Sequence, residues 1–341
     1  MRIDFHRHLE GSHSARALLL VAKKFQLQDP LFFQAGVYRT EAELAPLLQM
    51  QGEAGNASTF YTAIETARRA YVSPEAIAAL TYESFIDSAA EVDALEMRVS
   101  LFSMTRTLFG VKWRHVEPMT FAEKSREVLI GLIDARDRAE KTTHKKLLVR
   151  LGLSRTFESE THYRAMASVI REHASALCGL DVLGILSGPD KEPLQPGLVA
   201  IIDTLRDVLG DLTIHAGEFE DHRSVDRALA LSPRGIGHGV RALGSDATLQ
   251  TLRDHGVTLE VCPSSNQLLI PEVVAELRQS EHGKHPICAL HDHGVFAVLG
   301  SDDPVPMSTS FTTEWKLATE LGVNPERLAS DSERRWEQLA G

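Results

Sequence analysis

Short apolar segments alternate with longer amphipathic segments along almost the whole chain. Residues Ile3–His8 alternate apolar and polar side chains with a period of two, which predicts a β-strand with His6 and His8 on the same side. Seven more short, mostly apolar runs predict strands of the same kind. They lie at about residues 94–101, 147–151, 182–186, 212–215, 234–237, 257–262 and 295–299.

Helices are expected between these strands, where apolar residues recur with helical periodicity or a capping residue begins a segment. Ser73 is a favourable N-cap, and Pro74 suits the first helical position, so a helix is expected from there to about residue 91. Gly256 suits the left-handed position that ends a helix. The remaining helices are expected at about 121–141, 159–177, 197–209, 223–231, 245–256, 286–294, 312–321 and 325–339.

Eight apolar strands that alternate with helices predict an α/β fold, a (β/α)₈ TIM-type barrel that forms a single domain over residues 1–341. A doubly wound open sheet shows the same alternation. However, its common nucleotide-binding forms carry GxGxxG or GxxxxGK[ST], and this chain contains neither in the required place.

Two additions to the barrel are expected. Residues 26–60 carry only weak helical signals, broken by Gly36, Pro46 and Gly52. A segment that long after a first strand predicts a helical insertion, which we interpret as a lid over the active site. The last two expected helices extend the barrel at its C-terminal end.

Composition narrows the choice of partners. The chain has 36 Lys and Arg against 47 Asp and Glu, a net charge of −11, which argues against nucleic acid or an anionic membrane as partner. Three distant cysteines provide neither a disulfide framework nor a CxxC metal site. The longest early apolar run, Ala17–Ala22, is too short to cross a membrane and is followed by no signal-peptide cleavage pattern. We therefore expect a soluble, cytoplasmic protein; the sequence leaves its oligomeric state open.

Histidines and carboxylates stand at the ends of four expected strands. His6 and His8 end the first, His215 the fifth, His238 the sixth and Asp302 the eighth. Strand ends that are distant in sequence meet around one mouth of a barrel, where the catalytic residues of such barrels lie. Each motif alone is weak, since an HxH, a GHG or a DDP is usually incidental. Together, three imidazoles and a carboxylate predict a metal site with a position left for water.

These segments resemble the adenosine deaminase family of the amidohydrolase superfamily. The resemblance rests on HRHLEG at 6–11, HAGE at 215–218, GHG at 237–239, EVCPSSN at 260–266 and SDDP at 301–304, and it spans residues 3 to about 310. It implies a zinc enzyme that hydrolyses a 6-aminopurine nucleoside or base to the 6-oxo product and ammonia. Other amidohydrolases bridge two metals with a carboxylated lysine after the fourth strand. This chain has Ser187 and Gly188 there, so one Zn²⁺ is expected per chain.

The resemblance also implies a role for each site residue. Four residues would bind Zn²⁺: His6, His8, His215 and Asp302. Glu218 would give a proton to purine N1, and His238 would orient or deprotonate the metal-bound water. Asp303 would hold the ring at N7, and the backbone N–H of Gly188 would meet N3. Chemistry agrees with the role of Glu218, because an aromatic amine at C6 leaves poorly until N1 is protonated. A carboxylic acid whose pKa is raised by a dry pocket meets that need.

Glu10 departs from the pattern of adenosine-specific members, which usually carry Asp at this position to reach the ribose. Glu is found there in relatives that act on adenine or on other 6-aminopurine compounds, including aminodeoxyfutalosine. Glu10 is therefore either a substrate-binding residue or the cap of a turn. Conversion of adenosine to inosine is the first expectation, with adenine and aminodeoxyfutalosine as alternative substrates.

Two further functions fit the same barrel. A metal-dependent amide or ester hydrolase would turn over esters and release no ammonia from any aminopurine. A purine-binding or growth-factor-like protein with a vestigial site would contain no metal after purification. All the expected metal ligands are present, which favours an enzyme. The H-x-E and P-C-x-x-C signature of the small cytidine-deaminase type is absent.

Overall fold

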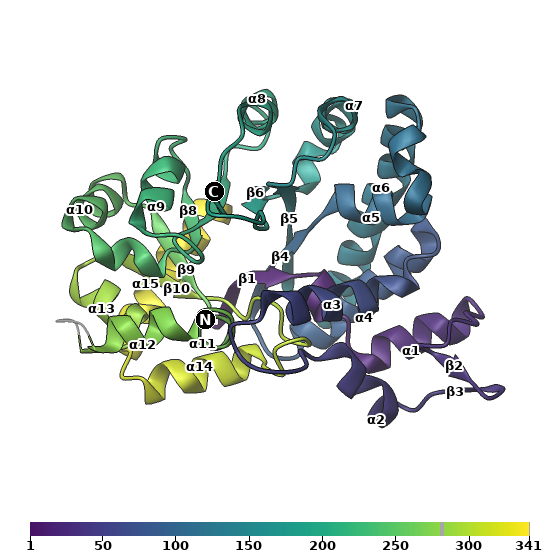
Figure 1. The fold of residues 1–341 in the computed structure, drawn as a ribbon, viewed down its shortest axis with the longest axis horizontal. Helices are drawn as coiled ribbons and strands as arrows, with labels where there is room; N and C mark the ends of the chain where they lie inside the picture. Colours follow the sequence, from purple (N-terminus) through teal and green to yellow (C-terminus); the bar gives the residue numbers. More distant parts are fainter. Residues whose placement is uncertain (280–282, 341) are drawn as a thin grey trace.

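Eight parallel strands follow one another around a barrel in the computed structural model, which describes residues 1–279 and 283–340 (Figure 1). They are β1 (Ile3–His8), β4 (Ala94–Val99), β5 (Lys146–Ser154), β6 (Gly179–Leu183), β7 (Leu212–Ala216), β8 (Gly235–His238), β9 (Thr258–Val261) and β10 (Phe296–Leu299). Each strand pairs in parallel with the next one in this order. This order confirms the (β/α)₈ barrel and excludes a doubly wound sheet, in which the strand order reverses at a switch point.

The barrel closes between β10 and β1 through the backbone of Asp302. The amide of Asp302 donates to the carbonyl of His6 at 2.7 Å, and the amide of His8 donates to the carbonyl of Asp302 at 2.8 Å. These bonds form a parallel bridge between Arg7 and Asp302. Asp302 has a φ of 58°, a left-handed conformation that Asp tolerates better than most residues. Closure of the barrel therefore also places Asp302 beside the two histidines of β1.

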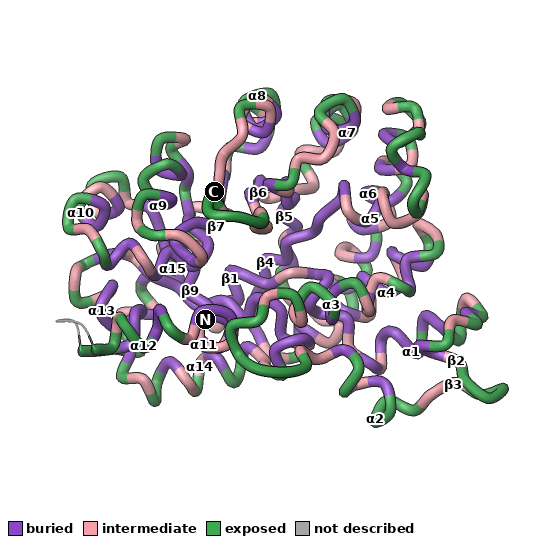
Figure 2. Tube along the Cα trace, viewed as in Figure 1, coloured by how far each residue is buried: buried purple, intermediate pink, exposed green. Residues whose placement is uncertain are grey.

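Helices surround the barrel, and their inner faces are buried while their outer faces are exposed (Figure 2). Ser73 accepts a hydrogen bond from the amide of Ala76, and Gly256 ends a helix with a φ of 62°, as predicted. Seven helices lie between strands at expected places: α4 (Pro74–Ala89), α6 (Pro118–Thr143), α7 (Glu160–Glu172), α8 (Pro196–Leu205), α9 (His222–Leu229), α10 (Asp246–His255) and α13 (Pro286–Asp292). After β10 follow α14 (Phe311–Glu320) and α15 (Pro325–Ala340). Among the described residues, every helix is too short or too polar to cross a bilayer.

Several elements differ from the sequence-based expectation. β6 begins at Gly179 and ends at Leu183, three residues earlier than predicted, because the buried Asp181 interrupts the apolar pattern inside the strand. After β4, three helices were not expected: α5 (Leu101–Phe109), which begins at the last residue predicted for a strand, and α11 (Pro263–Leu269) and α12 (Pro271–Gln279). The short α11 lies directly after β9 and so contributes to the mouth of the barrel.

The segment between β1 and α4 begins with α1 (Ala15–Lys24) and continues as a small hairpin of β2 (Phe33–Gln34) and β3 (Val37–Tyr38). The next elements are α2 (Glu41–Leu44), η2 (Ala45–Leu48), α3 (Ala57–Ala67) and η3 (Arg68–Ala70). Residues 26–60 thus contain one short α-helix and the first turn of α3. Within this segment, α3 lines the cavity at the mouth, and it extends beyond the residues in which the lid was expected.

Charged side chains fill part of the barrel interior, where branched apolar side chains usually predominate in this fold. Arg98 and Arg150, on neighbouring strands, are fully buried. The Nε of Arg98 lies 3.0 Å from Asp181, and its Nη2 contacts Glu260. Arg150 pairs with Glu96 at 2.7 Å. Both guanidinium groups therefore compensate buried carboxylates, and the two that Arg98 contacts, Asp181 and Glu260, lie against His215 and His6 at the barrel mouth.

Candidate metal and catalytic site

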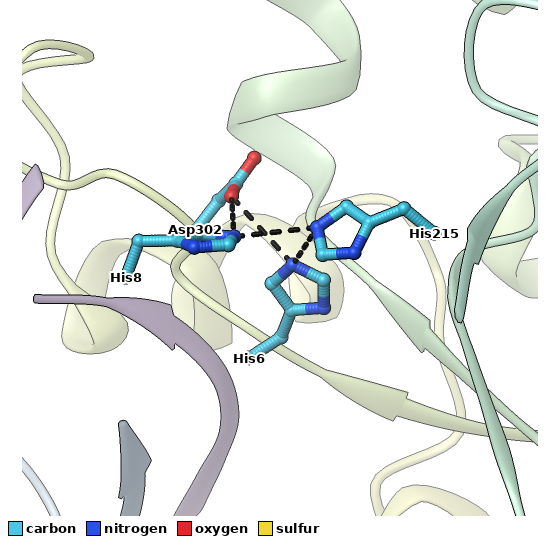
Figure 3. A group of neighbouring side chains, drawn as sticks. All are labelled: His6, His8, His215 and Asp302. Carbon is cyan, nitrogen blue, oxygen red and sulfur yellow. Dashed lines mark hydrogen bonds and ion pairs between the residues drawn. The ribbon is translucent and has the colours of Figure 1, made fainter. Parts of the chain in front are cut away.

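The four predicted metal ligands converge at the mouth of the barrel (Figure 3). The Nε2 atom of His215, on β7, lies 3.0 Å from Nε2 of His6 and 3.3 Å from Nε2 of His8, both on β1. The Oδ1 atom of Asp302 lies 3.3 Å from Nε2 of His8 and 3.6 Å from Nε2 of His6. The structure therefore brings the predicted set together, with its ligand atoms within 4.8 Å of one another.

The hydrogen-bond partners of these histidines fit a cation at the centre of the group. Nδ1 of His6 lies 3.3 Å from Glu260, and Nδ1 of His215 lies 3.1 Å from Asp181. A carboxylate at Nδ1 holds the imidazole proton there, so the Nε2 atoms face one another with their lone pairs. Burial and the charge of Arg98 hold the pKa of His6 well below its usual value, which keeps the ring in its neutral, ligating form. Nitrogen ligands about 2.0–2.1 Å from a tetrahedral metal stand about 3.3 Å apart, which matches the observed spacing.

A second group, His238, Cys262 and Asp302, also lies close together. Cys262 is buried, and its thiol donates a weak hydrogen bond to the carbonyl of Glu260 at 3.7 Å. Burial raises the pKa of the Cys262 thiol well above its usual value, so it stays protonated at neutral pH. Because the thiolate rather than the thiol is the metal ligand, the histidine–aspartate group fits a metal better than this second group does.

His238 and Glu218 face each other beside the four ligands. His238 ends β8 with a left-handed φ of 60°, and its Nε2 lies 3.4 Å from Oε2 of Glu218 and 3.9 Å from Oδ2 of Asp302. Burial lowers the pKa of His238 to about 3, so the ring is neutral. Burial, together with the charges of Asp302 and Glu192, raises the pKa of Glu218 well above its usual value. The site thus holds a carboxyl group whose pKa is raised, Glu218, next to a neutral imidazole, His238.

A cavity of about 250 Å³ opens above the cluster. Glu10 and Asp303 line it together with Glu218, His238 and the ligands His8, His215 and Asp302. Gly11 is required where it stands, because a Cβ there would lie 1.9 Å from Oδ1 of Asp303. Burial and the neighbouring Asp302 raise the pKa of Asp303 well above its usual value. Burial therefore favours the protonated form of Asp303, which donates a hydrogen bond as well as accepting one.

Comparison with known proteins agrees with this geometry. A family model described as adenosine deaminase matches residues 2–331. The chain belongs to the adenosine deaminase family. It is therefore a hydrolase that acts on carbon–nitrogen bonds in cyclic amidines, as the sequence motifs predicted.

Individual members of the family are distant from this chain. An adenosine deaminase of Klebsiella pneumoniae is 27% identical over 330 residues, which cover 95% of this chain and 89% of the relative. An adenine deaminase of Agrobacterium fabrum is 28% identical over 333 residues, covering 96% and 90%. The crystal structure of an adenine deaminase from Arthrobacter aurescens shares the fold with a TM-score of 0.73 at 17% identity, covering 100% of this chain and 99% of that one. Nothing in these comparisons supports a purine-binding protein without activity.

The backbone contact assigned to Gly188 requires a correction. Gly188 is exposed in the loop after β6 and is not among the residues that line the cavity of this deaminase. Gly184, the residue directly after β6, does line it, with a φ of 84°. The misplacement follows from the strand itself, which ends three residues earlier than the apolar pattern indicated.

Glu10 pairs with the segment that covers the mouth. Its carboxylate is buried, accepts a hydrogen bond from the amide of Ser100 at 3.3 Å, and lies 3.6 Å from Nη2 of Arg68. Arg68 follows α3 and pairs at 2.6 Å with Glu65 on that helix. Burial raises the pKa of Glu10, and the guanidinium of Arg68 opposes this shift. Glu10 thus joins β1 to the α3 segment while it lines the cavity, which is more than the cap of a turn.

Four buried charged residues of the deaminase site were not found by sequence reasoning. Asp181 and Glu260 hold the ligand histidines from inside the barrel. Arg155 and Glu192 line the cavity beside Glu218. A carboxylate within an apolar barrel strand is a signal that marks Asp181 and Glu260 in the sequence. Glu192 stands in an irregular loop, where nothing in the local pattern distinguishes it from a solvated side chain.

Proposed function

We propose that this deaminase hydrolyses the 6-amino group of a 6-aminopurine to the 6-oxo product and ammonia, with zinc as its metal and adenosine as the first candidate substrate. The observation that carries the proposal is the pairing of Glu218 with a neutral His238 at 3.4 Å, beside the four-ligand group and inside one cavity. A bound zinc ion would lower the pKa of water toward about 7 and so make a hydroxide nucleophile available at neutral pH.

The ligand chemistry supports zinc as the metal. Three imidazoles and one carboxylate suit zinc better than magnesium or calcium, which prefer oxygen ligands. Purified protein is expected to contain about one zinc per chain, measured by inductively coupled plasma mass spectrometry. A full complement of another metal, with turnover retained, would contradict zinc while leaving the site intact.

Two residues of the cavity transfer protons, and two others bind the purine ring. Glu218 donates its proton to purine N1, which makes C6 susceptible to attack, and His238 takes the proton that the attacking water loses. The protonated carboxyl of Asp303 donates to N7, an atom that only accepts hydrogen bonds. The backbone N–H of Gly184 is the donor for N3. His238 passes the proton that it took from the water to the C6 amino group as the C6–N bond breaks, so the nitrogen leaves as ammonia. The proton of the new C6 hydroxyl returns to Glu218, which leaves the 6-oxo product.

The cover of the site is proposed to be α3 rather than residues 26–60 as a whole. Phe60, Tyr61 and Ile64 of α3 line the cavity with apolar surface, opposite Leu269 of α11. Tyr61 of α3 and Ile185 of the loop after β6 line the same cavity. Such a cover would exclude water from the polar groups beneath it, which strengthens their interactions with substrate.

The first experiment is a turnover screen across 6-aminopurines. The compounds are adenine, adenosine, 2′-deoxyadenosine, AMP, N6-substituted adenines and aminodeoxyfutalosine, with ammonia release and the ultraviolet spectrum of the 6-oxo product as readouts. We expect at least one compound to be converted, with adenosine first and adenine second. The curated relatives cited above act on one or the other at nearly the same identity, so the screen decides between them. Conversion of none, with ester turnover instead, would replace the proposed reaction.

Glu10→Asp is expected to shift preference toward adenosine over adenine by about tenfold in kcat/KM. The shorter side chain vacates space at the Arg68 side of the cavity, and one methylene in a binding pocket is worth about 1–3 kcal/mol of discrimination. Steady-state kinetics on the two substrates provide the measurement. Glu65→Gln, which alters the other carboxylate of Arg68, should leave the ranking unchanged. An unaltered ranking in Glu10→Asp would remove Glu10 from substrate selection.

A further inference from the structure

The turn that carries Glu218 is held by a carboxylate from a different loop. Glu192 lies between β6 and α8 and is 2% exposed. Its Oε2 accepts a hydrogen bond from the amide of Gly217 at 2.8 Å. Its Oε1 accepts from the amides of Phe219 at 2.8 Å and Glu218 at 3.2 Å. One buried side chain thus binds three consecutive backbone amides.

This arrangement fixes the backbone of Glu218 from outside its own segment. Consecutive N–H groups that converge form an anion-binding concavity, and a carboxylate in it makes charge-assisted hydrogen bonds, about twice as strong as neutral ones. Gly217 begins the turn with a left-handed φ of 66°, where a Cβ would meet Val225 at 2.6 Å. The local sequence permits the turn, and Glu192 holds it.

A neighbouring arginine ties the same region to the metal-ligand strand. Arg155 is buried, and its guanidinium donates to the carbonyl of Gly184 at 3.0 Å and to the carbonyl of His215. The charges of Glu192 and Arg155 act in opposite directions on the carboxyl of Glu218: Glu192 raises its pKa and Arg155 lowers it. Asp302, which also raises it, His238, Asp303 and Tyr61 are further charged or titratable groups near Glu218.

We propose that Glu192 is a positioning residue for the deamination: it holds the turn of residues 217–219 so that the carboxyl of Glu218 faces purine N1. The inference rests on the function proposed above for Glu218. Glu192 does not touch the reacting atoms in this account, and its effect passes through Glu218.

Glu192→Gln tests the proposal. Glutamine retains one acceptor oxygen but replaces the other with an NH₂ group, which faces a backbone N–H instead of accepting from it. We expect kcat to fall by about ten- to a hundredfold, with KM changed by less than about threefold and the zinc content unchanged. Asp190→Asn is the matched control, since it removes the same charge from the same loop, where Asp190 is exposed and pairs with Arg227 at 3.7 Å. Its kcat should equal that of the unaltered enzyme.

A double-mutant cycle separates positioning from general stabilisation. If Glu192 acts through Glu218, then Glu192→Gln should lower kcat by less than about twofold in a Glu218→Gln background. An equal fractional loss in both backgrounds would overturn the proposal. Wild-type turnover in the same assay reports the proposed function separately: no 6-oxo product from the wild type would refute that function and this role together.

Hydrogen exchange provides a readout that does not depend on activity. The amides of residues 217–219 should exchange faster in Glu192→Gln than in the wild type or in Asp190→Asn, as measured by mass spectrometry of the peptide that contains them. Unchanged exchange would show that Glu192 does not hold the turn. Faster exchange with an unchanged kcat would show that holding the turn does not matter for turnover, which also overturns the proposal.

Discussion

Glu218→Gln is expected to lower kcat by about 10²–10⁴-fold while the protein keeps its metal and its fold. The amide has nearly the shape of the carboxyl but has no acidic proton to give to purine N1. The expected loss is large because the aromatic C6 amine is a poor leaving group until N1 is protonated and the ring is disrupted. Neighbouring His238 cannot substitute, because burial lowers its pKa to about 3 and leaves it without a proton to give.

Steady-state kinetics on the best substrate of the screen, with metal content measured on the same sample, test this prediction. The pH profile adds a second check. Only the protonated carboxyl donates, and burial raises its pKa, so wild-type turnover should fall as the pH rises through that value. The residual activity of Glu218→Gln should lack this fall. Retention of more than about a tenth of kcat would remove Glu218 from the mechanism.

The convergence of the four expected metal ligands could be predicted from the sequence because they stand at strand ends of a fold with a single functional mouth. His6, His8, His215 and Asp302 are each adjacent to an apolar run, and the eightfold alternation of strands and helices is enough to bring those ends together. Neither the left-handed backbone of Asp302 nor its role in closing the barrel is visible in the sequence. Both depend on the neighbouring strand.

The errors have one physical origin, which is charge buried inside the barrel. Asp181 lies within β6 and made the strand look three residues later than it is, which displaced the expected substrate contact from Gly184 to Gly188. A pattern search treats a carboxylate as a sign of solvent, yet Asp181 is fully buried because Arg98 compensates its charge. Arg98 and Asp181 are 83 positions apart in the sequence, so no local sequence window contains both of them.

The helix that lines the cavity begins inside the segment expected to cover the site and extends beyond it. The insertion was expected to act through residues 26–60, whose helical signals are weak. The structure puts the cavity-lining residues on α3, and Arg68, just beyond that helix, pairs with Glu10 of the barrel. The ion pair between Arg68 and Glu10 and the burial of apolar side chains therefore place α3 at the mouth. The sequence alone shows only where a helix can form.

Arg98→Met is expected to destabilise the protein by about 3–5 kcal/mol and to weaken metal binding by about ten- to a hundredfold. Arg98 is fully buried, and its guanidinium contacts Asp181 at 3.0 Å and also Glu260. These two carboxylates hold Nδ1 of His215 and His6. Without the guanidinium, two buried negative charges lose their compensation, so each must take up a proton or move, and the ligand histidines lose their orientation.

Arg150→Met separates the two effects of that change. Arg150 is also fully buried, on the adjacent strand, but it pairs with Glu96 and Asp211. Among the described residues, these two carboxylates are not partners of the four expected metal ligands, whereas Asp181 and Glu260 are. Both variants should lower the unfolding free energy of the metal-free protein in denaturant titrations. Only Arg98→Met should lower metal affinity in competition with a chromophoric chelator. If Arg98→Met does not fold, Arg98→Lys replaces it in the test. Lysine retains the positive charge but cannot contact Asp181 and Glu260 at the same time, so this variant should bind metal more weakly without a large loss of stability. Equal metal affinities in the two methionine variants would mean that Arg98 stabilises the barrel without orienting the ligands.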